Sequence, residues 1–184
     1  MASIGLARKL GERNPRPLRF DGHFAYVPLT RGKEAKIDAS DAALVGSMTW
    51  SLTSQGYARA AYTNEHGKTV TYSMHRLIAG AGRDEHVDHA DGDKLNNTKR
   101  NLRICEHYQN MGNRGAQKNN SSGAKGVSFC RQTRRWRAII TVKGITHRLG
   151  RFTEKADAAA AYDTAALALL GEFAKPNNGE MNAR

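Results

Sequence analysis

Short runs of alternating apolar and polar residues dominate the N-terminal part of the chain. Five runs lie between residues 20 and 78, separated mainly by Gly, Asp and Asn: FAYVPL, EAKIDA, MTWSLT, GYARAAYT and TVTYSMHRLI. A period of two residues is typical of strands with one buried face, and the separating residue types favour turns. The pattern predicts a small β-rich module over residues 20–74.

The C-terminal part joins a strand pattern to a helix pattern. Residues 126–152 form three strand-like runs, which are broken near the sequence TRR and at Gly144. Beyond them, Thr153 is a candidate N-cap and Gly171 a candidate helix end. Between these two, apolar residues recur at helical spacing, at Ala158, Tyr162, Ala165 and Leu169. We predict a three-stranded antiparallel sheet backed by one helix over residues 122–176, since three strands and a helix need each other to bury a core.

Sheet and helix are expected to share one core. Alternation assigns to the buried face of the sheet the residues Val127, Phe129, Ile139, Ile140 and Leu149. The alanines at positions 158, 159, 160, 161, 165 and 166 indicate close packing of the helix on the sheet. Tyr162 is expected to fill the gap between them.

The rest of the chain is polar and rich in turn-forming residues. A Gly-punctuated segment runs to residue 102, and CEHYQNMGNR follows it as a short candidate helix. Gly, Ser and Asn then mark residues 115–121 as a linker. Residues 1–19 form a basic tail, and residues 177–184 a second tail. We therefore expect an α+β chain built of small modules.

Composition and charge narrow the class of protein. Hydrophobic residues make up 39% of the 184 residues and aromatic residues 7%, which favours several small modules over one large core. The 29 Lys and Arg against 17 Asp and Glu give a net charge of +12. Such an excess favours a nucleic-acid partner, with a solvated basic surface as the alternative. Between Ser121 and Thr153 there are eight Lys and Arg and no acidic residue, whereas a merely solvated surface mixes its signs.

Cysteine content and hydropathy point to a setting inside the cell. Two cysteines, Cys105 and Cys130, cannot build a disulfide framework. The chain contains no apolar run of the roughly 20 residues that a membrane span needs, and no signal peptide opens it. We expect a soluble protein in a reducing compartment, without a membrane partner.

The segment HVDHADGDKLNNTKRNLR, residues 86–103, is the main candidate for chemistry. Its aspartates fail the EF-hand spacing in both registers. Zinc is an alternative, though with unusual spacings, through His86, His89, Cys105 and His107. In a third interpretation, an aspartate and a side-chain amide hold one hard divalent cation, and a neighbouring histidine takes a proton from water. Magnesium suits such a sparse oxygen ligand set.

Three motifs, MHRLI, VDHADGDKLNNTKRNLR and YQNMGNR, resemble the HNH nuclease motif of phage and intron-homing endonucleases. The resemblance implies a central β-β-α-metal fold over residues 75–114. It implies Asp88 and Asn110 as ligands of one Mg or Mn ion and His89 as the general base. Asn101 matches the middle asparagine, which ties the loop together and orients the base. His75 and Arg76 match an upstream His-Arg pair; we assign His75 to the catalytic group and Arg76 to DNA contacts, with a structural role as the alternative.

Two departures from the HNH pattern are visible. Cys105 stands where many relatives carry Ser or Thr before the helix, and sulfur is a weaker cap acceptor. The four cysteines that clamp some HNH domains are also missing. We expect packing against the first module to replace them.

The C-terminal segment resembles the DNA-binding domain of plant APETALA and ethylene-response transcription factors, which phage HNH proteins also carry. The resemblance rests on KGVSF, WRAII, LGRF, AAAAYDTAAL and GEFAKPN. It implies a three-stranded sheet in the major groove of DNA. The residues that match or neighbour DNA-contacting positions are Lys125, Arg131, Arg134, Arg135, Trp136, Arg137, Arg148 and Arg151.

These resemblances combine into one functional prediction. The chain is expected to be a phage-encoded, metal-dependent HNH endonuclease that acts on double-stranded DNA in the host cytoplasm. A single HNH site in a short chain favours a monomer that nicks one strand. The alternative is a sequence-specific DNA-binding protein with an inactive nuclease site. RNA binding is a weaker alternative, because the chain has no recognisable RNA module.

Overall fold

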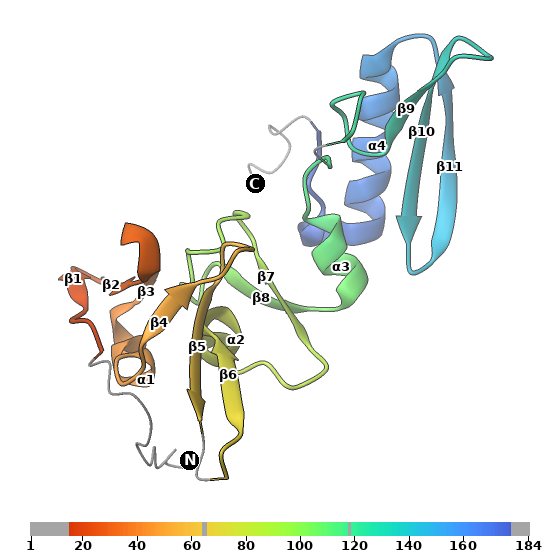
Figure 1. The fold of residues 1–184 in the computed structure, drawn as a ribbon. Helices are drawn as coiled ribbons and strands as arrows, with labels where there is room; N and C mark the ends of the chain where they lie inside the picture. Colours follow the sequence, from red (N-terminus) through yellow and green to blue (C-terminus); the bar gives the residue numbers. More distant parts are fainter. Residues whose placement is uncertain (1–14, 64–65, 118, 178–184) are drawn as a thin grey trace. The chain divides into compact units, whose positions relative to one another are not determined.

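The computed structural model describes residues 15–63, 66–117 and 119–177 (Figure 1). The chain divides into two compact units, Met1–Ile104 and Cys105–Arg184, which we describe one at a time. The expected tails at 1–19 and 177–184 lie mostly outside the described residues. Within those residues, no helix is long and apolar enough to cross a membrane.

Two three-stranded antiparallel sheets make up most of the first unit. One contains β1 (Arg19–Asp21), β2 (Phe24–Pro28) and β3 (Glu34–Asp38) in that order. The other contains β4 (Trp50–Leu52), β5 (Ala58–Thr63) and β6 (Thr69–Ser73). The short helix η1 (Thr30–Gly32) joins β2 to β3, and η2 (Ala39–Asp41) and α1 (Ala42–Val45) lie between β3 and β4 along the chain. These strands confirm the β-rich module that the alternating pattern predicted.

The last alternating run, TVTYSMHRLI, is only half strand. Strand β6 ends at Ser73, and α2 (Met74–Ala79) begins at the next residue. Met74 and Ile78 are buried, because residues four apart share a helix face. Gly80 ends the helix with φ of 65°, a conformation that favours glycine. The prediction of a strand through the whole run was therefore wrong beyond Ser73.

Strands β7 (His86–His89) and β8 (Leu102–Cys105) form a two-stranded sheet. The segment that joins them is hydrogen-bonded to β3 of the N-terminal sheet. In the segment that joins them, the Leu95 carbonyl accepts a hydrogen bond from the Lys36 N–H at 2.8 Å. The Asn97 N–H donates to the Lys36 carbonyl at 2.7 Å. Leu95 and Leu102 also pack on the core of the first unit. The segment thus packs against the first module; that this packing replaces the missing cysteines stays a prediction.

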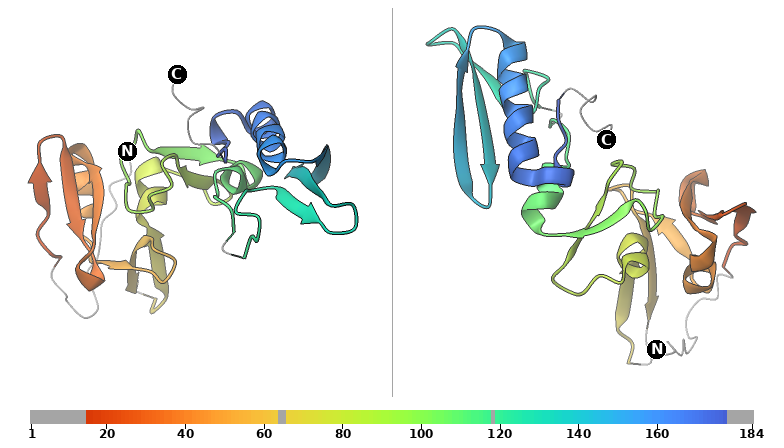
Figure 2. Two further views of the ribbon diagram at one scale, coloured as in Figure 1. Left: turned by 90° about the horizontal axis from the view of Figure 1, so that it is seen from above. Right: turned by 180° about the vertical axis from the view of Figure 1, so that it is seen from behind.

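The second unit is a sheet covered by a helix. Strands β9 (Val127–Cys130), β10 (Arg135–Val142) and β11 (Ile145–Phe152) pair antiparallel with β10 in the centre. Helix α4 (Lys155–Leu170) lies along one face of this sheet, and η3 (Gly171–Phe173) follows it (Figures 1 and 2). The three strands and their two breaks agree with the sequence pattern.

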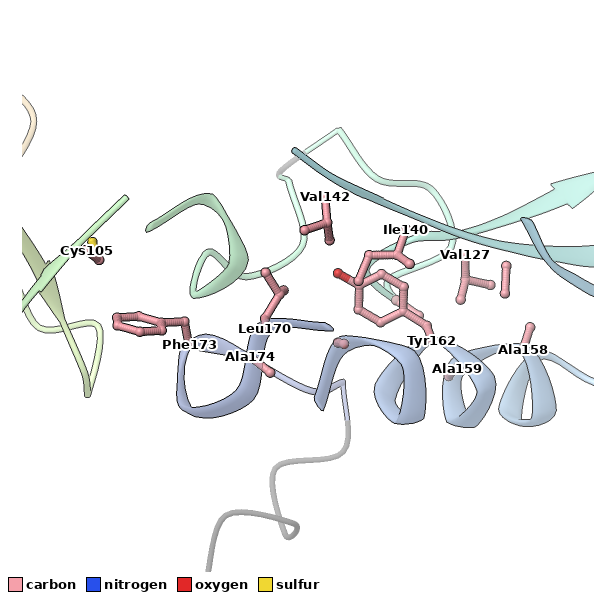
Figure 3. Packing of buried hydrophobic residues seen from close by; sticks show 13 residues of the cluster. Cys105, Val127, Ile140, Val142, Ala158, Ala159, Tyr162, Leu170, Phe173 and Ala174 are labelled. Carbon is pink, nitrogen blue, oxygen red and sulfur yellow. The ribbon is translucent and has the colours of Figure 1, made fainter. Parts of the chain in front are cut away.

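The core between α4 and the sheet contains the expected tyrosine. Figure 3 shows Tyr162 reaching from α4 towards Ile140 and Val127 of the sheet. Ala158 and Ala159 are buried beside it, whereas Ala160 is exposed. The close approach also depends on Gly126, because a Cβ there would meet the Tyr162 ring at 2.1 Å.

Three details of this module differ from the prediction. Ile139 is only half-buried and lies outside the core that contains its neighbours Ala138 and Ile140, because adjacent residues of a strand point to opposite faces. Phe129 is 48% exposed and is not part of the core; its ring contacts the Trp136 ring at a centroid distance of 5.0 Å. The N-cap of α4 is Glu154 instead of Thr153, and its side chain makes no capping hydrogen bond. Gly171 ends the helix as expected.

The short helix α3 (His107–Gly112) opens the second unit. Its N-cap is Glu106, and the Gln109 side chain accepts the Glu106 N–H at 2.8 Å in a capping box. Cys105 is therefore not the cap, and its sulfur instead lies in the core of the unit (Figure 3). The doubt that the sequence raised about this helix is removed, because a carboxylate and an amide perform the capping.

Candidate functional site

Asp88 and His89 end strand β7 and are both buried, with 5% of each residue exposed. These are the residues that the sequence predicts as metal ligand and general base. A buried ionisable residue requires compensating partners, because its desolvation is costly. The surroundings of each side chain therefore indicate how it is held.

The Asp88 carboxylate is paired with Arg103. Arg103 belongs to β8, the neighbouring strand, and its Nη2 donates to Asp88 Oδ2. The two side chains are 17% and 6% exposed, so the ion pair is largely shielded from water. Arg103 had no predicted role, although it is the arginine of the Asn-Leu-Arg part of the motif. Its partner lies fifteen positions away, on a strand that only the fold brings alongside.

The His89 ring lies among aromatic rings and one buried amide. Its centroid is 5.2 Å from that of His75 on α2 and 5.9 Å from that of Tyr57. The His75 and Tyr57 rings are themselves 5.1 Å apart, so the three rings form one cluster. His89 Nε2 lies 3.5 Å from Oδ1 of Asn97, a fully buried residue. Asn97 and Tyr57 had no predicted role, and no sequence signal marks Tyr57.

Burial favours the neutral form of both histidines. It lowers the pKa of His75 to about 4, and the charges of His89 and Arg76 add to this effect. Burial also lowers the pKa of His89, although the contact with Asn97 and the carboxylates of Asp88, Asp91 and Asp93 act in the opposite direction. A neutral imidazole nitrogen can accept a proton, whereas an imidazolium cannot. The Nδ1 of His75 is buried and has no hydrogen-bond partner among the described residues.

Asn101 organises the loop between β7 and β8. Its Nδ2 donates to Asp91 Oδ1 at 2.9 Å and to the Asn96 carbonyl at 2.7 Å. Its Oδ1 accepts the Asp91 N–H at 3.0 Å. Asp93 and Asn96 make similar local bonds, as expected for turn formers. Asn101 therefore ties the loop together, and Asn97 is the asparagine whose side chain lies beside His89.

Arg76 differs from its prediction as a DNA contact. Its guanidinium donates to the carbonyls of Glu85, Gly82 and Arg83, in the loop that precedes β7. These bonds engage the guanidinium within the protein. The structural alternative for Arg76 is therefore favoured.

The other metal predictions concern Asn110 and the zinc alternative. Asn110 lies on α3 in the second unit and is half-buried; its role as a ligand stays a prediction. Among the described residues, no group of three or more His, Cys, Asp and Glu side chains is gathered so as to hold a metal. The zinc alternative thus has no cluster to support it.

Four arginines share one face of the C-terminal sheet. Arg137 on β10 lies directly opposite Arg151 on β11, and Arg148 lies opposite Ile139. Arg135 is two residues from Arg137 and therefore points to the same side. The face turned to α4 carries the alternating buried residues Ala138, Ile140 and Val142. All four arginines are exposed, so they lie on the face away from the helix.

The remaining predicted DNA contacts are placed differently. Trp136 alternates onto the helix side and packs against the hydrophobic core, so it does not join the arginine face. Lys125 Nζ donates to the Gly112 carbonyl at the end of α3, and burial lowers its pKa to about 8. Each of these side chains makes contacts within the unit, and its role in DNA binding stays a prediction. Arg131 and Arg134 are exposed in the turn between β9 and β10.

Comparison with known proteins gives the chain a family. The uncharacterized HNH endonuclease L560 of Acanthamoeba polyphaga mimivirus is 32% identical over 162 residues, which cover 86% of this chain and 77% of that protein. Protein 3.8 of Escherichia phage T7 is 37% identical over 62 residues, which cover 34% of this chain and 51% of that protein. No family model matches the chain.

One solved structure, of DNA binding and cleavage by the HNH homing endonuclease I-HmuI, matches 70% of this chain and 72% of that chain at 22% identity and a TM-score of 0.35. The family assignment rests on the mimivirus relative. The chain belongs to the HNH endonuclease family.

Proposed function

We propose that this chain is a divalent-cation-dependent endonuclease that hydrolyses phosphodiester bonds in double-stranded DNA, with His89 as its general base. The observation that carries the proposal is the buried pair of Asp88 and His89 at the end of β7. Both side chains are braced, Asp88 by Arg103 and His89 by the ring cluster and Asn97. Family membership supports the same chemistry.

In the proposed reaction, His89 accepts a proton from a water molecule. The water oxygen forms a bond to the scissile phosphorus, and the bond between phosphorus and the 3′ oxygen breaks. The leaving 3′ oxygen takes a proton from solvent water, so the products are a 5′-phosphate and a 3′-hydroxyl. The burial that lowers the pKa of His89 supports this role, because the acceptor form of the ring is then present at neutral pH.

Asp88 is the residue that would hold one Mg or Mn ion, and Asn110 stays a second ligand predicted from its place in the motif. A carboxylate and an amide supply the oxygen ligands that such hard cations prefer, and water and phosphate oxygens complete their coordination. When bound, the cation supplies positive charge to stabilise the phosphorane and the leaving oxygen. The buried Asp88 carboxylate fits this ligand set, whereas Asn110 is supported by its place in the motif alone.

The arginine face of the C-terminal sheet is the proposed DNA-binding surface. Arg137 and Arg151 lie directly opposite each other, and like charges in that position destabilise a sheet. A polyanion across this face would offset the repulsion. Arginine also reads guanine edges and clamps phosphates. The resemblance to the APETALA and ethylene-response DNA-binding domain stays a prediction.

Two finer features belong to the same proposal. One candidate site per chain supports nicking of a single strand by a monomer. The viral origin of both relatives supports a phage-encoded protein that acts in the cytoplasm of an infected host cell.

A supercoiled-plasmid assay with Mg, Mn or chelator tests the catalytic proposal. Wild type should convert supercoiled plasmid to nicked circles with either metal, and chelator should stop the reaction. His89→Ala should slow cutting about 100-fold or more, the usual contribution of a general base. Asp88→Asn, which keeps the shape of the side chain, should do the same.

His86→Ala is the matched control, since His86 lies on the same strand and has no role in the proposed site. It should cut like wild type; under the zinc alternative it would not. Equal cutting by wild type, His89→Ala and Asp88→Asn would remove the proposed site. DNA binding without cutting under any metal would favour the alternative of a DNA-binding protein with an inactive site.

A further inference from the structure

The ion pair between Arg103 and Asp88 places a positively charged guanidinium beside the carboxylate that is proposed to hold the cation. The pair bridges adjacent strands β8 and β7, and both side chains are largely buried. A guanidinium beside a carboxylate at this depth is a strong interaction, because water screens it poorly. Arg103 is therefore part of the immediate surroundings of the proposed ligand.

The Arg103–Asp88 ion pair stabilises the protein when no cation is bound. A buried carboxylate without a counter-charge is strongly destabilising. Arg103 supplies that counter-charge when no metal is present. The geometry is also compatible with a bound cation, since an ionised carboxylate has two oxygens and about four acceptor positions.

The same pair acts against cation binding. A divalent ion at Asp88 would sit near the guanidinium, and the two positive charges repel each other through a poorly screened medium. The affinity of Asp88 for the ion is therefore lower than it would be without Arg103. A DNA phosphate at the site carries negative charge, which would offset this repulsion.

We propose that Arg103 is a positioning residue that holds Asp88 in the cation-free protein and keeps its cation affinity low until DNA is bound. This inference rests on the proposed function of Asp88 as a metal ligand. It adds that cation loading and DNA binding favour each other. By thermodynamic linkage, each should then raise the affinity for the other by the same factor.

Electron paramagnetic resonance of Mn²⁺ measures this without any cleavage. The full chain is titrated with Mn²⁺ in four forms: wild type, Arg103→Gln, Arg103→Lys and Asp88→Asn. Without DNA, Arg103→Gln should bind Mn²⁺ about tenfold more tightly than wild type, which corresponds to about 1.4 kcal/mol. Arg103→Lys keeps the charge and should remain close to wild type. Asp88→Asn should lose the site.

The outcomes separate the two proposals. If Asp88→Asn loses Mn²⁺ binding but Arg103→Gln binds no more tightly than wild type, the role of Arg103 is wrong and the metal site stands. If wild type and Asp88→Asn bind equally, the metal site is wrong, and the role of Arg103 with it.

Wild type alone provides a second test, in case Arg103→Gln does not fold as judged by its thermal melt. A short duplex should tighten Mn²⁺ binding by wild type several-fold, after subtraction of the Mn²⁺ that the same duplex binds in the presence of Asp88→Asn. An unchanged affinity would overturn the inference.

Discussion

Asn101 and Asp91 bind each other twice across the loop between β7 and β8. The Asn101 side chain donates to the Asp91 carboxylate at 2.9 Å and accepts the Asp91 N–H at 3.0 Å. A third bond joins the same side chain to the Asn96 carbonyl at 2.7 Å. Because asparagine is here both donor and acceptor, an aspartate in its place would lose two bonds and bring two carboxylates together.

Asn101→Asp should destabilise the first unit by roughly 2–3 kcal/mol, since an unmade buried hydrogen bond costs about 1–3 kcal/mol. Urea unfolding measures this in a Trp136→Phe background, where Trp50 is the remaining tryptophan and reports on the first unit. Asn119→Asp, at an exposed position, is the control and should leave the midpoint unchanged. An equal midpoint for both variants would contradict the role of Asn101 in the loop.

Gly126→Ala should destabilise the second unit severely. The φ of Gly126 is 71°, and an added Cβ would lie 2.1 Å from the Tyr162 ring and 2.6 Å from the Ile139 carbonyl. We expect a loss of about 3 kcal/mol or more, the range of overpacked cores and strained backbone combined. Trp136 fluorescence, in a Trp50→Phe background, follows this unit.

Gly123→Ala is the matched control for Gly126→Ala. Gly123 has the same φ of 71°, but nothing lies within 4 Å of an added Cβ. Its cost should be limited to the backbone strain, about 1 kcal/mol. Similar losses for both variants would mean that contact with Tyr162 does not limit residue 126.

The first unit should lose stability in mild acid through His75. Burial lowers its folded-state pKa to about 4, below the ordinary value of 6.5. The unfolded chain therefore binds the proton more readily between these pH values. The stabilisation of the folded state that comes from the neutral His75 ring is complete above pH 6.5 and is lost as the pH falls towards 4. The loss is roughly 3 kcal/mol, since each unit of pKa difference corresponds to about 1.36 kcal/mol.

His75→Phe retains an aromatic ring but cannot titrate. Urea midpoints measured between pH 7 and pH 4 should fall less steeply for this variant than for wild type. His66→Phe changes an exposed histidine and should keep the wild-type slope. A wild-type slope in His75→Phe would show that other groups cause the acid sensitivity.

Arg151→Thr should have two effects at once: it should weaken DNA binding and stabilise the C-terminal sheet. It removes one of two arginines that lie directly opposite each other. The unfolding free energy of the second unit should rise by about 0.5 kcal/mol, within the usual range for cross-strand pairs. The slope of log K against log salt for DNA binding should decrease by about 1, as expected for one lost phosphate contact.

Lys155→Gln is the control for Arg151→Thr, because it removes one positive charge at the start of α4, away from the arginine face. Its salt slope should match wild type. A slope that falls equally for both variants would mean that net charge, and not the arginine face, governs binding.

The sequence predicted the elements whose periodicity was uninterrupted. Strands β2 to β6 and β9 to β11 follow from alternation, and α4 follows from helical spacing that ends at Gly171. Strands β1, β7 and β8 lie outside the alternating runs. Helix α2 was missed because alternation in TVTYS continues without a turn residue into MHRLI. Met74 and Ile78 are four residues apart, so they fit both the period of two of a strand and the spacing of one face of a helix.

The candidate site was only partly accessible to sequence reasoning. The Asp-His pair and Asn101 stand at motif positions, so type and spacing suffice to find them. Arg103 and Tyr57 acquire their surroundings from the pairing of strands and the packing of α2, which a linear pattern does not contain. For the same reason the sequence does not indicate that the Lys125 ammonium group binds the Gly112 carbonyl at the end of α3.

The packing of α3 determines at which residue the polypeptide chain can be divided so that its C-terminal module can be exchanged. Gly112 approaches Leu170 so closely that an added Cβ would lie 2.8 Å from it, and Cys105 lies in the same core as Phe173. A C-terminal piece that starts at the linker, near residue 121, would leave that core exposed to water. Exchange of the C-terminal module between proteins, in the laboratory or in evolution, should therefore begin near Cys105, and the transferred piece carries Asn110 with it.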